Sequence, residues 1–251
     1  MPQLPSLLGV VAHPDDEALL LGGVLAQHAA RGARTAVVTA TWAPDTHRAA
    51  ELAESLRILG AGEPRMLGYA DHRIPESAPG WPRLCDAPLD QVVEDVVRHI
   101  RAVRPETVVT HDAYGQLTGH PDHRLTHRAT LLAVAAAGLE YLYPEAGEPW
   151  QPTTVHLATH PHSALADLGP LLTRAAKSVL SVPADTVDLT VDVTPWLGQK
   201  WAAITAHRSQ VERERPLPGL LSRLPRDARD RILATEYYTR LAFRPTPGKA
   251  G

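Results

Sequence analysis

The feature that most constrains this sequence is a short apolar run that ends abruptly in a cluster of charged side chains. Residues 7–12 read Leu-Leu-Gly-Val-Val-Ala, which predicts a buried strand, and residues 13–17 read His-Pro-Asp-Asp-Glu. Pro14 has no amide hydrogen to donate to a sheet, so the strand ends there. A helical pattern follows at 18–31. An imidazole and three carboxylates therefore occupy the turn between a first strand and a first helix.

The alternation of strand and helix patterns continues along most of the chain. Apolar residues at helical spacing mark 46–59, 89–103 and 124–138, and short apolar runs predict strands at 34–41, 66–67, 107–110 and 155–159. Strands that alternate with helices predict a mostly parallel sheet with helices on both faces. We therefore expect a Rossmann-like α/β fold.

The chain after residue 160 is less regular. The patterns there predict strands at 189–193 and 236–243, a helix at 195–207, and a charged, proline-interrupted and partly helical segment at 213–231. We predict a single domain over residues 1–251 with an irregular C-terminal part and a flexible tail at 245–251.

The composition is that of an ordinary soluble globular protein. With 28 acidic and 25 basic residues the formal net charge is −3, which gives no argument for nucleic acid or an anionic membrane as partner. No apolar run reaches the roughly 18 residues of a membrane span. Residues 1–6 lack the positive start of a signal peptide, so we expect a cytoplasmic protein. The composition leaves a homo-oligomer open.

The single cysteine, Cys85, limits the kinds of site that the chain can build. One cysteine cannot form an internal disulfide, and it excludes a cysteine-based structural zinc site. Several other signatures are absent: the dinucleotide-binding glycine motif after the first strand, the Walker A loop, the Gly-x-Ser-x-Gly elbow and the His-Glu-x-x-His zinc motif.

A second polar cluster of the same kind follows the predicted strand at 107–110. Residues 119–123 read Gly-His-Pro-Asp-His. The carboxyl ends of parallel strands meet at one edge of a sheet, where ligands bind, so we expect this cluster to lie beside residues 13–17. Two imidazoles, one carboxylate and an open position are the ligand set of a catalytic zinc site, and iron or cobalt suits the same ligands.

The remaining polar groups suit a hydrolase. Such an enzyme needs a carboxylate near the activated water and a donor where the oxyanion forms. Of the neighbours Asp15 and Asp16, one can bind the metal while the other faces the water. His120 and His123 can likewise divide between electrophile and ligand, and Asp122 is placed to orient a histidine. Residue types alone leave this division open.

These two motifs together resemble the signature pair of the PIG-L/LmbE-like family. Members are metal-dependent N-deacetylases, typically acting on N-acetylglucosamine conjugates, with the mycothiol- and bacillithiol-pathway enzymes among them. The resemblance extends in order over about residues 5–210. Before the second motif it includes Arg48 and Glu51 followed by Leu59-Gly60, and then Leu67-Gly68-Tyr69-x-Asp71. It also includes residues 104–110, which lead into the second motif, and Lys200 with His207-x-Ser209-Gln210 after it.

The resemblance implies an LmbE-like fold and a role for each matching residue. The metal ligands, for one Zn²⁺, would be His13, Asp16 and His123; the general base would be Asp15; His120 would stabilise the oxyanion or protonate the leaving amine, supported by Asp122. Arg48, Asp71 and His207 would lie near the substrate, and Tyr114 is a candidate lid residue there. Glu17 has no catalytic role in this scheme and is expected to support the start of the first helix.

For the other histidines we expect structural or supporting roles. We expect His127 to be a packed or solvated helix residue, and His160 and His162 to be structural or solvated. His111 ends the strand at 107–110 and could support a metal ligand. Residues 41–45 depart from the family's pattern and are expected to border the substrate mouth, with 69–88 and 211–235 as the other variable parts.

The leading functional hypothesis is a zinc-dependent amide hydrolase that removes an N-acetyl group from an N-acetylglucosamine-type conjugate, a small molecule. One alternative is an amidase of the same fold that acts on a thiol conjugate or a natural-product intermediate. Another is a non-catalytic sugar-binding relative, which would need a broken metal or base position. All of the residues at those positions are present, which disfavours it.

Overall fold

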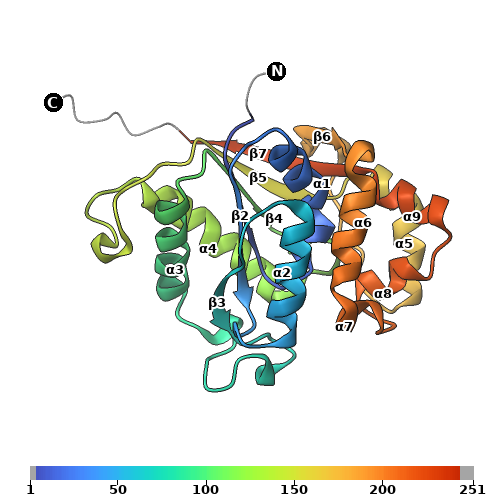
Figure 1. Ribbon diagram of the computed structural model, residues 1–251, viewed down its shortest axis with the longest axis horizontal. Helices are drawn as coiled ribbons and strands as arrows, with labels where there is room; N and C mark the ends of the chain where they lie inside the picture. The colour runs from blue at the N-terminus through green and yellow to red at the C-terminus, as the bar shows by residue number, and fades with distance from the viewer. Residues whose placement is uncertain (1–3, 244–251) are drawn as a thin grey trace.

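The computed structural model describes residues 4–243, and its centre is a seven-stranded sheet (Figure 1). The strand order is β3-β2-β1-β4-β5-β7-β6. The strands are β1 (Leu7–Val11), β2 (Thr35–Thr41), β3 (Arg65–Tyr69), β4 (Thr107–His111), β5 (Thr154–Thr159), β6 (Leu189–Asp192) and β7 (Thr235–Ala242). Strands β1 to β5 run parallel, and β7 pairs antiparallel with both β5 and β6. The predicted mostly parallel sheet is confirmed.

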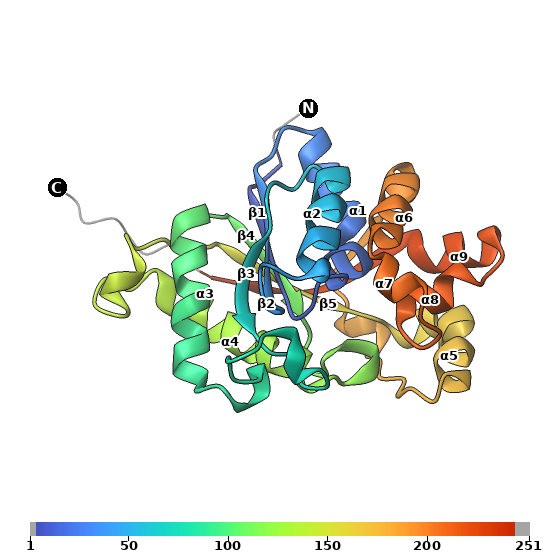
Figure 2. The ribbon, with the colours of Figure 1, turned by 60° about the horizontal axis from the view of Figure 1, so that its bottom comes forward.

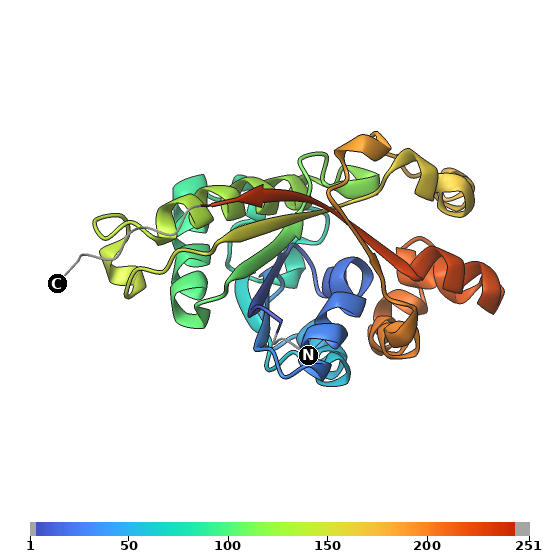
Figure 3. The same cartoon turned by 90° about the horizontal axis from the view of Figure 1, so that it is seen from above.

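Helices cover both faces of the sheet, as predicted. The helices are α1 (Asp16–Ala30), α2 (His47–Leu59), α3 (Leu89–Val103), α4 (Pro121–Ala137), α5 (Leu165–Arg174), α6 (Leu197–Ala206), α7 (Arg208–Val211), α8 (Leu217–Ser222) and α9 (Arg226–Leu233). Figure 3 shows α1, α2 and α6 on one side of the sheet and α3 and α4 on the other. Two hydrophobic cores correspond to these two faces.

Helix α3 illustrates why these segments form the helices that the sequence predicts. Its apolar residues recur at helical spacing, and they make up most of what the helix buries: Val92, Val93, Val96, Val97, Ile100 and Val103. Burying one such side chain contributes roughly 1.5–3 kcal/mol, so this face fixes the helix against the sheet. Strand β1 is buried along its whole length, which is why it reads as a continuous apolar run.

The topology places the two polar motifs side by side. Strands β2 and β3 extend the sheet on one side of β1, and β4 and β5 extend it on the other. The strand order therefore reverses between β1 and β4, and such a switch point leaves a crevice at the carboxyl ends of the strands. Residues 13–17 follow β1, and the segment after β4 leads to residues 119–123, so both motifs lie at this crevice.

The C-terminal part adds a wall beside the crevice. Figure 2 shows α5, α8 and α9 gathered beyond the end of the parallel sheet, next to α6 and α7. A small apolar cluster that contains Leu168 and Leu172 of α5 holds them together. The predicted irregular region is thus a set of short helices, whereas the predicted tail at 245–251 lies outside the described residues. Within residues 4–243, every helix is too short or too polar to cross a membrane.

A buried carboxylate of β7 ties the C-terminal part to the first helix. Glu236 accepts hydrogen bonds from the amides of Gly23 and Val24 in α1, at 2.8 and 3.0 Å. It also accepts from Lys200 Nζ at 2.7 Å and from the Tyr238 hydroxyl at 2.9 Å. Lys200 and Glu236 are only 1% and 4% exposed, so each charge depends on the other for compensation.

We predict that Glu236→Gln lowers the free energy of unfolding by about 3–5 kcal/mol, because it leaves the Lys200 ammonium buried without a counter-charge. Denaturant unfolding followed by circular dichroism measures this. Glu63→Gln, at an exposed position, is the matched control and should leave stability unchanged. Equal stability of the Glu236 variant and the wild type would contradict the prediction.

Candidate metal centre and active site

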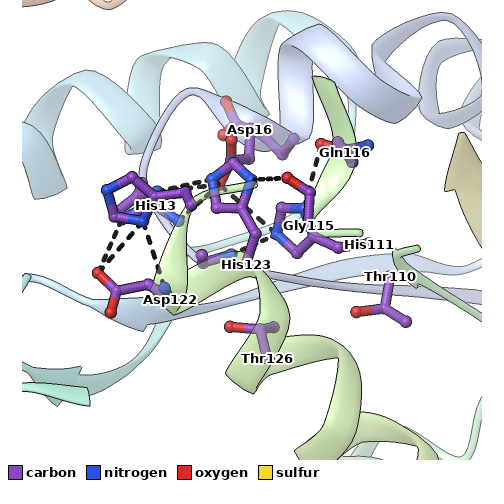
Figure 4. A network of polar contacts seen from close by, with 12 residues as sticks. His13, Asp16, Thr110, His111, Gly115, Gln116, Asp122, His123 and Thr126 are labelled. Carbon is purple, nitrogen blue, oxygen red and sulfur yellow. Dashed lines mark hydrogen bonds and ion pairs between the residues drawn. The ribbon is translucent and has the colours of Figure 1, made fainter. Parts of the chain in front are cut away.

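Three side chains from the two motifs converge on one point (Figure 4). His13 Nδ1 lies 3.1 Å from His123 Nε2 and 3.3 Å from Asp16 Oδ2, and the last two atoms are 3.4 Å apart. All three side chains are largely buried. The ligand triplet that the family resemblance implies is therefore assembled by the fold.

The triangle formed by these three atoms has the size of a tetrahedral metal site. A metal with ligand bonds of about 2.0–2.1 Å separates its ligand atoms by roughly 3.3–3.4 Å when the geometry is tetrahedral. The observed separations of 3.1–3.4 Å match this spacing. The residues therefore fit a divalent metal ion, and a tetrahedral site with three protein ligands keeps one position open.

Hydrogen bonds on the opposite ring nitrogens orient the two imidazole ligands. His123 Nδ1 lies 3.2 Å from the carbonyl oxygen of Gly115, a residue whose φ of +71° favours glycine. His13 Nε2 lies 3.2 Å from Asp122 Oδ2. Donation through these nitrogens leaves His123 Nε2 and His13 Nδ1 with free lone pairs toward the metal position.

Asp122 thus has a partner that the sequence did not specify. The resemblance implies that it supports His120, but its carboxylate is 3.8 Å from His120 Nδ1 and only 3.2 Å from His13 Nε2. Its second hydrogen bond comes from the amide of His72 at 2.9 Å. The carboxylate therefore orients a metal ligand, and its contact with His120 is the weaker one.

His111 stands next to the triangle without belonging to it. It stacks on His123 with ring centroids 4.1 Å apart. Its Nε2 accepts the Ala12 amide at 2.9 Å, and its Nδ1 faces Gln116 Oε1 at 3.2 Å. Both ring nitrogens are therefore engaged, and His111 supports the site by packing. His127 donates to the His111 carbonyl at 2.8 Å, in keeping with its predicted packing role.

The electrostatics of the triangle favour a cation. Burial opposes a charge on Asp16, but the imidazoles of His123 and His13 outweigh it and hold the pKa of Asp16 well below its usual range. Burial also opposes a charge on His13, yet hydrogen bonds to Asp122 and Asp16 raise the pKa of His13 well above its usual range, so a bound metal ion would take the place of the proton on Nδ1. Burial lowers the pKa of His123 well below its usual range. The buried negative charge of Asp16 therefore favours a cation beside it, either a protonated imidazole or a metal ion.

Asp15 occupies a strained backbone position just outside the triangle. Its φ is 128° and its ψ −25°, a region that side-chain-bearing residues rarely adopt and that costs about 1–3 kcal/mol. Its carboxylate lies 3.4 Å from Arg48 Nη2. Burial raises the pKa of Asp15 to about 6, partly offset by Arg48. The strain turns this carboxylate into the cavity beside its neighbour Asp16.

Glu17 holds Asp15 in this conformation. Its Oε2 accepts the Asp15 amide at 2.9 Å, and its Oε1 accepts from the Ser55 hydroxyl at 2.6 Å and lies 2.7 Å from His207 Nε2. Glu17 and His207 are both fully buried. Sequence reasoning expected Glu17 only to favour the start of the helix, and it missed this network because His207 lies 190 positions away.

The same network contains His207. The resemblance implies a place near the substrate, but the side chain has no exposed surface and lies outside the residues that line the cavity. The charge on Glu17 outweighs the effect of burial and raises the pKa of His207. In this structure His207 contacts Glu17 and is not among the residues that line the cavity, and its predicted place near the substrate stays a prediction.

His120 caps helix α4 and faces the cavity. Its Nδ1 accepts the Asp122 amide at 3.3 Å, which places the ring hydrogen on Nε2. Burial, together with the nearby His13, lowers the pKa of His120 to about 4. His120 is thus a neutral hydrogen-bond donor, which suits an oxyanion better than an acid that delivers a proton.

The cavity at this site has a volume of about 360 Å³. Arg48 and Asp71 line it, as expected, and so does His160, whose buried Nδ1 has no partner in the described structure. Tyr114 is 49% exposed and lies outside the lining, so the structure does not place it against a substrate.

The variable loops contribute unequally to this cavity. Residues 41–45 are not among the residues that line it, and Trp42 is buried with the Arg48 guanidinium 5.2 Å from its ring centroid. Their predicted place at the substrate mouth stays a prediction. The 69–88 loop contributes three lining residues, Asp71, Arg73 and Ile74. Several residues between 213 and 233 also line the cavity.

Comparison with known proteins places this geometry in a family. The family PIG-L, described as GlcNAc-PI de-N-acetylase, matches residues 8–134. The chain belongs to the PIG-L family. This confirms the resemblance predicted from the two motifs.

Among PIG-L relatives, the 1D-myo-inositol 2-acetamido-2-deoxy-alpha-D-glucopyranoside deacetylase of Mycolicibacterium smegmatis is 36% identical, covering 82% of this chain and 80% of its own. The protein of the same name from Streptomyces scabiei is 33% identical, covering 92% and 83%. The N,N'-diacetylchitobiose deacetylase from Pyrococcus horikoshii superposes with a TM-score of 0.63 at 19% identity, covering 98% and 88%, and supports the fold.

For this PIG-L chain we predict that Glu17→Gln lowers turnover about 10- to 100-fold while metal content stays unchanged, because Asp15 loses the carboxylate that positions it. Steady-state kinetics and metal analysis measure the two quantities. Ser55→Ala is the graded comparison: it removes one hydrogen bond from Glu17 but keeps the bond to Asp15, so its effect should be smaller. Wild-type turnover in the Glu17 variant would refute this role.

Proposed function

We propose that this protein is a metal-dependent N-deacetylase that removes the acetyl group from the N-acetylglucosamine unit of a small glycoside conjugate. The observation that carries the proposal is the ligand triangle of His13, Asp16 and His123, with Asp15 and the neutral His120 on the walls of the same cavity. The family and the names of the curated relatives support the same chemistry.

The proposed metal is Zn²⁺, with Fe²⁺ or Co²⁺ compatible with the same two imidazoles and one carboxylate. When bound, such an ion supplies Lewis acidity that polarises the amide carbonyl and makes a water molecule easier to deprotonate. The chain's own residues supply the remaining steps.

Asp15 is the proposed general base. Its carboxylate lies in the cavity, is held by Glu17 through the backbone, and has a pKa raised to about 6 by burial. A base with a pKa near neutrality can take a proton from water and later return it to the leaving amine. Arg48, 3.4 Å from Asp15, favours the ionised form that accepts the proton.

His120 is the proposed oxyanion donor. Its neutral ring presents Nε2–H to the cavity, and such a donor stabilises the negative charge that develops on the carbonyl oxygen after water attacks. Asp122 would keep His13 oriented, and Arg48 and Asp71 are the proposed contacts for the sugar. The amide bond then breaks, releasing acetate and the free amine.

The proposal is tested with purified protein and a panel of N-acetylated substrates. Acetate release from N-acetylglucosaminides, including the inositol glycoside named in the relatives, should require metal, disappear on chelation and return on addition of Zn²⁺, Fe²⁺ or Co²⁺. Deacetylation of N-acetylated thiol conjugates or natural-product intermediates alone would favour the alternative amidase. Binding of a sugar without any turnover by the metal-loaded protein would overturn the proposal.

We predict that Asp15→Asn keeps its metal but loses about 10²- to 10⁴-fold in turnover, because the amide cannot accept the proton from water. Metal content and acetate release are measured on the same sample. Asp45→Asn, an exposed carboxylate outside the cavity, is the matched control and should remain fully active. Full activity of the Asp15 variant would remove it as the base.

A further inference from the structure

The cavity mouth carries four cationic side chains that the proposed reaction does not use. Arg73, Lys177, Arg213 and Arg215 all line the cavity. They come from three separate segments: the loop after β3, the turn after α5, and the connection between α7 and α8. We call these four residues the cationic mouth.

None of the four forms an ion pair within the described residues. Across 4–243, no carboxylate oxygen lies within 4.0 Å of their side-chain nitrogens, whereas Arg48, Arg57, Arg83, Arg98 and Arg231 each have an acidic partner. Glu212 and Glu214 flank the two arginines in sequence but do not line the cavity. The four cations therefore line the cavity without an ion-pair partner, although the carboxylates of Asp15, Asp16 and Asp71 line the same cavity.

The charges of the cationic mouth influence the pKa values of one another and of a residue at the proposed catalytic site. Burial and then the fields of Arg73, Arg215 and Arg213 lower the pKa of Lys177, while Asp15 opposes this change. Arg73 is also among the charges that lower the pKa of His120. The cationic mouth therefore lies near the catalytic residues, and gathering like charges there carries an electrostatic cost that an anionic ligand would relieve.

The chemistry of these side chains specifies the kind of ligand. Arginine presents a planar fork of donors that matches phosphate and carboxylate oxygens, and lysine adds a point charge. The acetamido group at the metal end is neutral, so it gives the mouth nothing to bind. The inositol glycoside named in the relatives also carries no acidic group in its name.

We propose that the cationic mouth binds a phosphate or carboxylate group of the substrate, so that this enzyme acts on an anionic amino-sugar conjugate. The sugar part of this statement rests on the proposed deacetylase function, whereas the anion part rests on the four cations alone. The charged group belongs to the part of the conjugate that is attached to the N-acetylated sugar.

The test measures binding of product-like amines, which cannot be deacetylated, to the metal-loaded protein by calorimetry. Three glucosamine conjugates of similar size are compared, one neutral, one with a phosphate and one with a carboxylate. The anionic conjugates should bind at least about tenfold more tightly than the neutral one. This advantage should shrink as salt rises, because the mouth is solvent-accessible.

Variants separate charge from shape. Arg213→Gln combined with Arg215→Gln should abolish most of the advantage without changing the affinity for the neutral conjugate. Arg213→Lys combined with Arg215→Lys keeps the charge and should retain much of it. Arg128→Gln, an exposed arginine on α4 that does not line the cavity, is the matched control and should behave as wild type.

The outcomes distinguish this inference from the proposed function. Equal affinity for neutral and anionic conjugates, no detectable binding of the anionic ones, or an equal loss for both in the glutamine variant would overturn the anionic substrate. If neutral N-acetylglucosaminides are nevertheless deacetylated, the proposed deacetylase function stands and only the anionic substrate is ruled out. If no substrate is deacetylated but the anionic preference and its loss in the glutamine variant are observed, the anion site stands and the deacetylase function fails.

Discussion

The hydrogen bonds of the buried Glu17 carboxylate are the interaction on which the geometry of this site depends. They hold the Asp15 amide and thereby maintain a backbone conformation with a φ of 128°. A residue with a side chain stays in such a region only when its surroundings compensate for the strain. Ser55 of α2 and His207 of the C-terminal part complete the network, so three distant segments must pack correctly before the base is in place.

The sheet topology provides the frame for that network. Because β1 and β4 are neighbours, the motif at 13–17 and the motif at 119–123 meet although about a hundred residues separate them. Their side chains then form a triangle of ligand atoms whose hydrogen-bonded outer nitrogens fix the imidazole tautomers. Residues of the C-terminal part also line the cavity, and Arg213 and Arg215 of the cationic mouth are among them.

Several elements could be read from local pattern because their burial is periodic. Helix α3 and strand β1 show in the sequence the faces that they bury. The paired His-Pro-Asp motifs predicted a metal site, and the family resemblance implied the three ligands that the structure brings together. The partner of Asp122, the burial of His207 and the Lys200–Glu236 pair could not be read in this way. Each depends on which side chains meet across the fold, and no local spacing records that.

What the sequence by itself determined is the α/β class, the position of the polar motifs at strand ends, and the residue types that can hold a metal and move a proton. The tertiary structure alone decided which imidazole Asp122 orients, that Glu17 positions Asp15, and that Arg73, Lys177, Arg213 and Arg215 share one cavity. The physical reason is the distance along the chain over which each kind of interaction acts. Backbone preferences and hydrophobic periodicity act over a few residues, whereas hydrogen bonds between buried groups and the fields of unpaired charges depend on distances that only the packed chain sets.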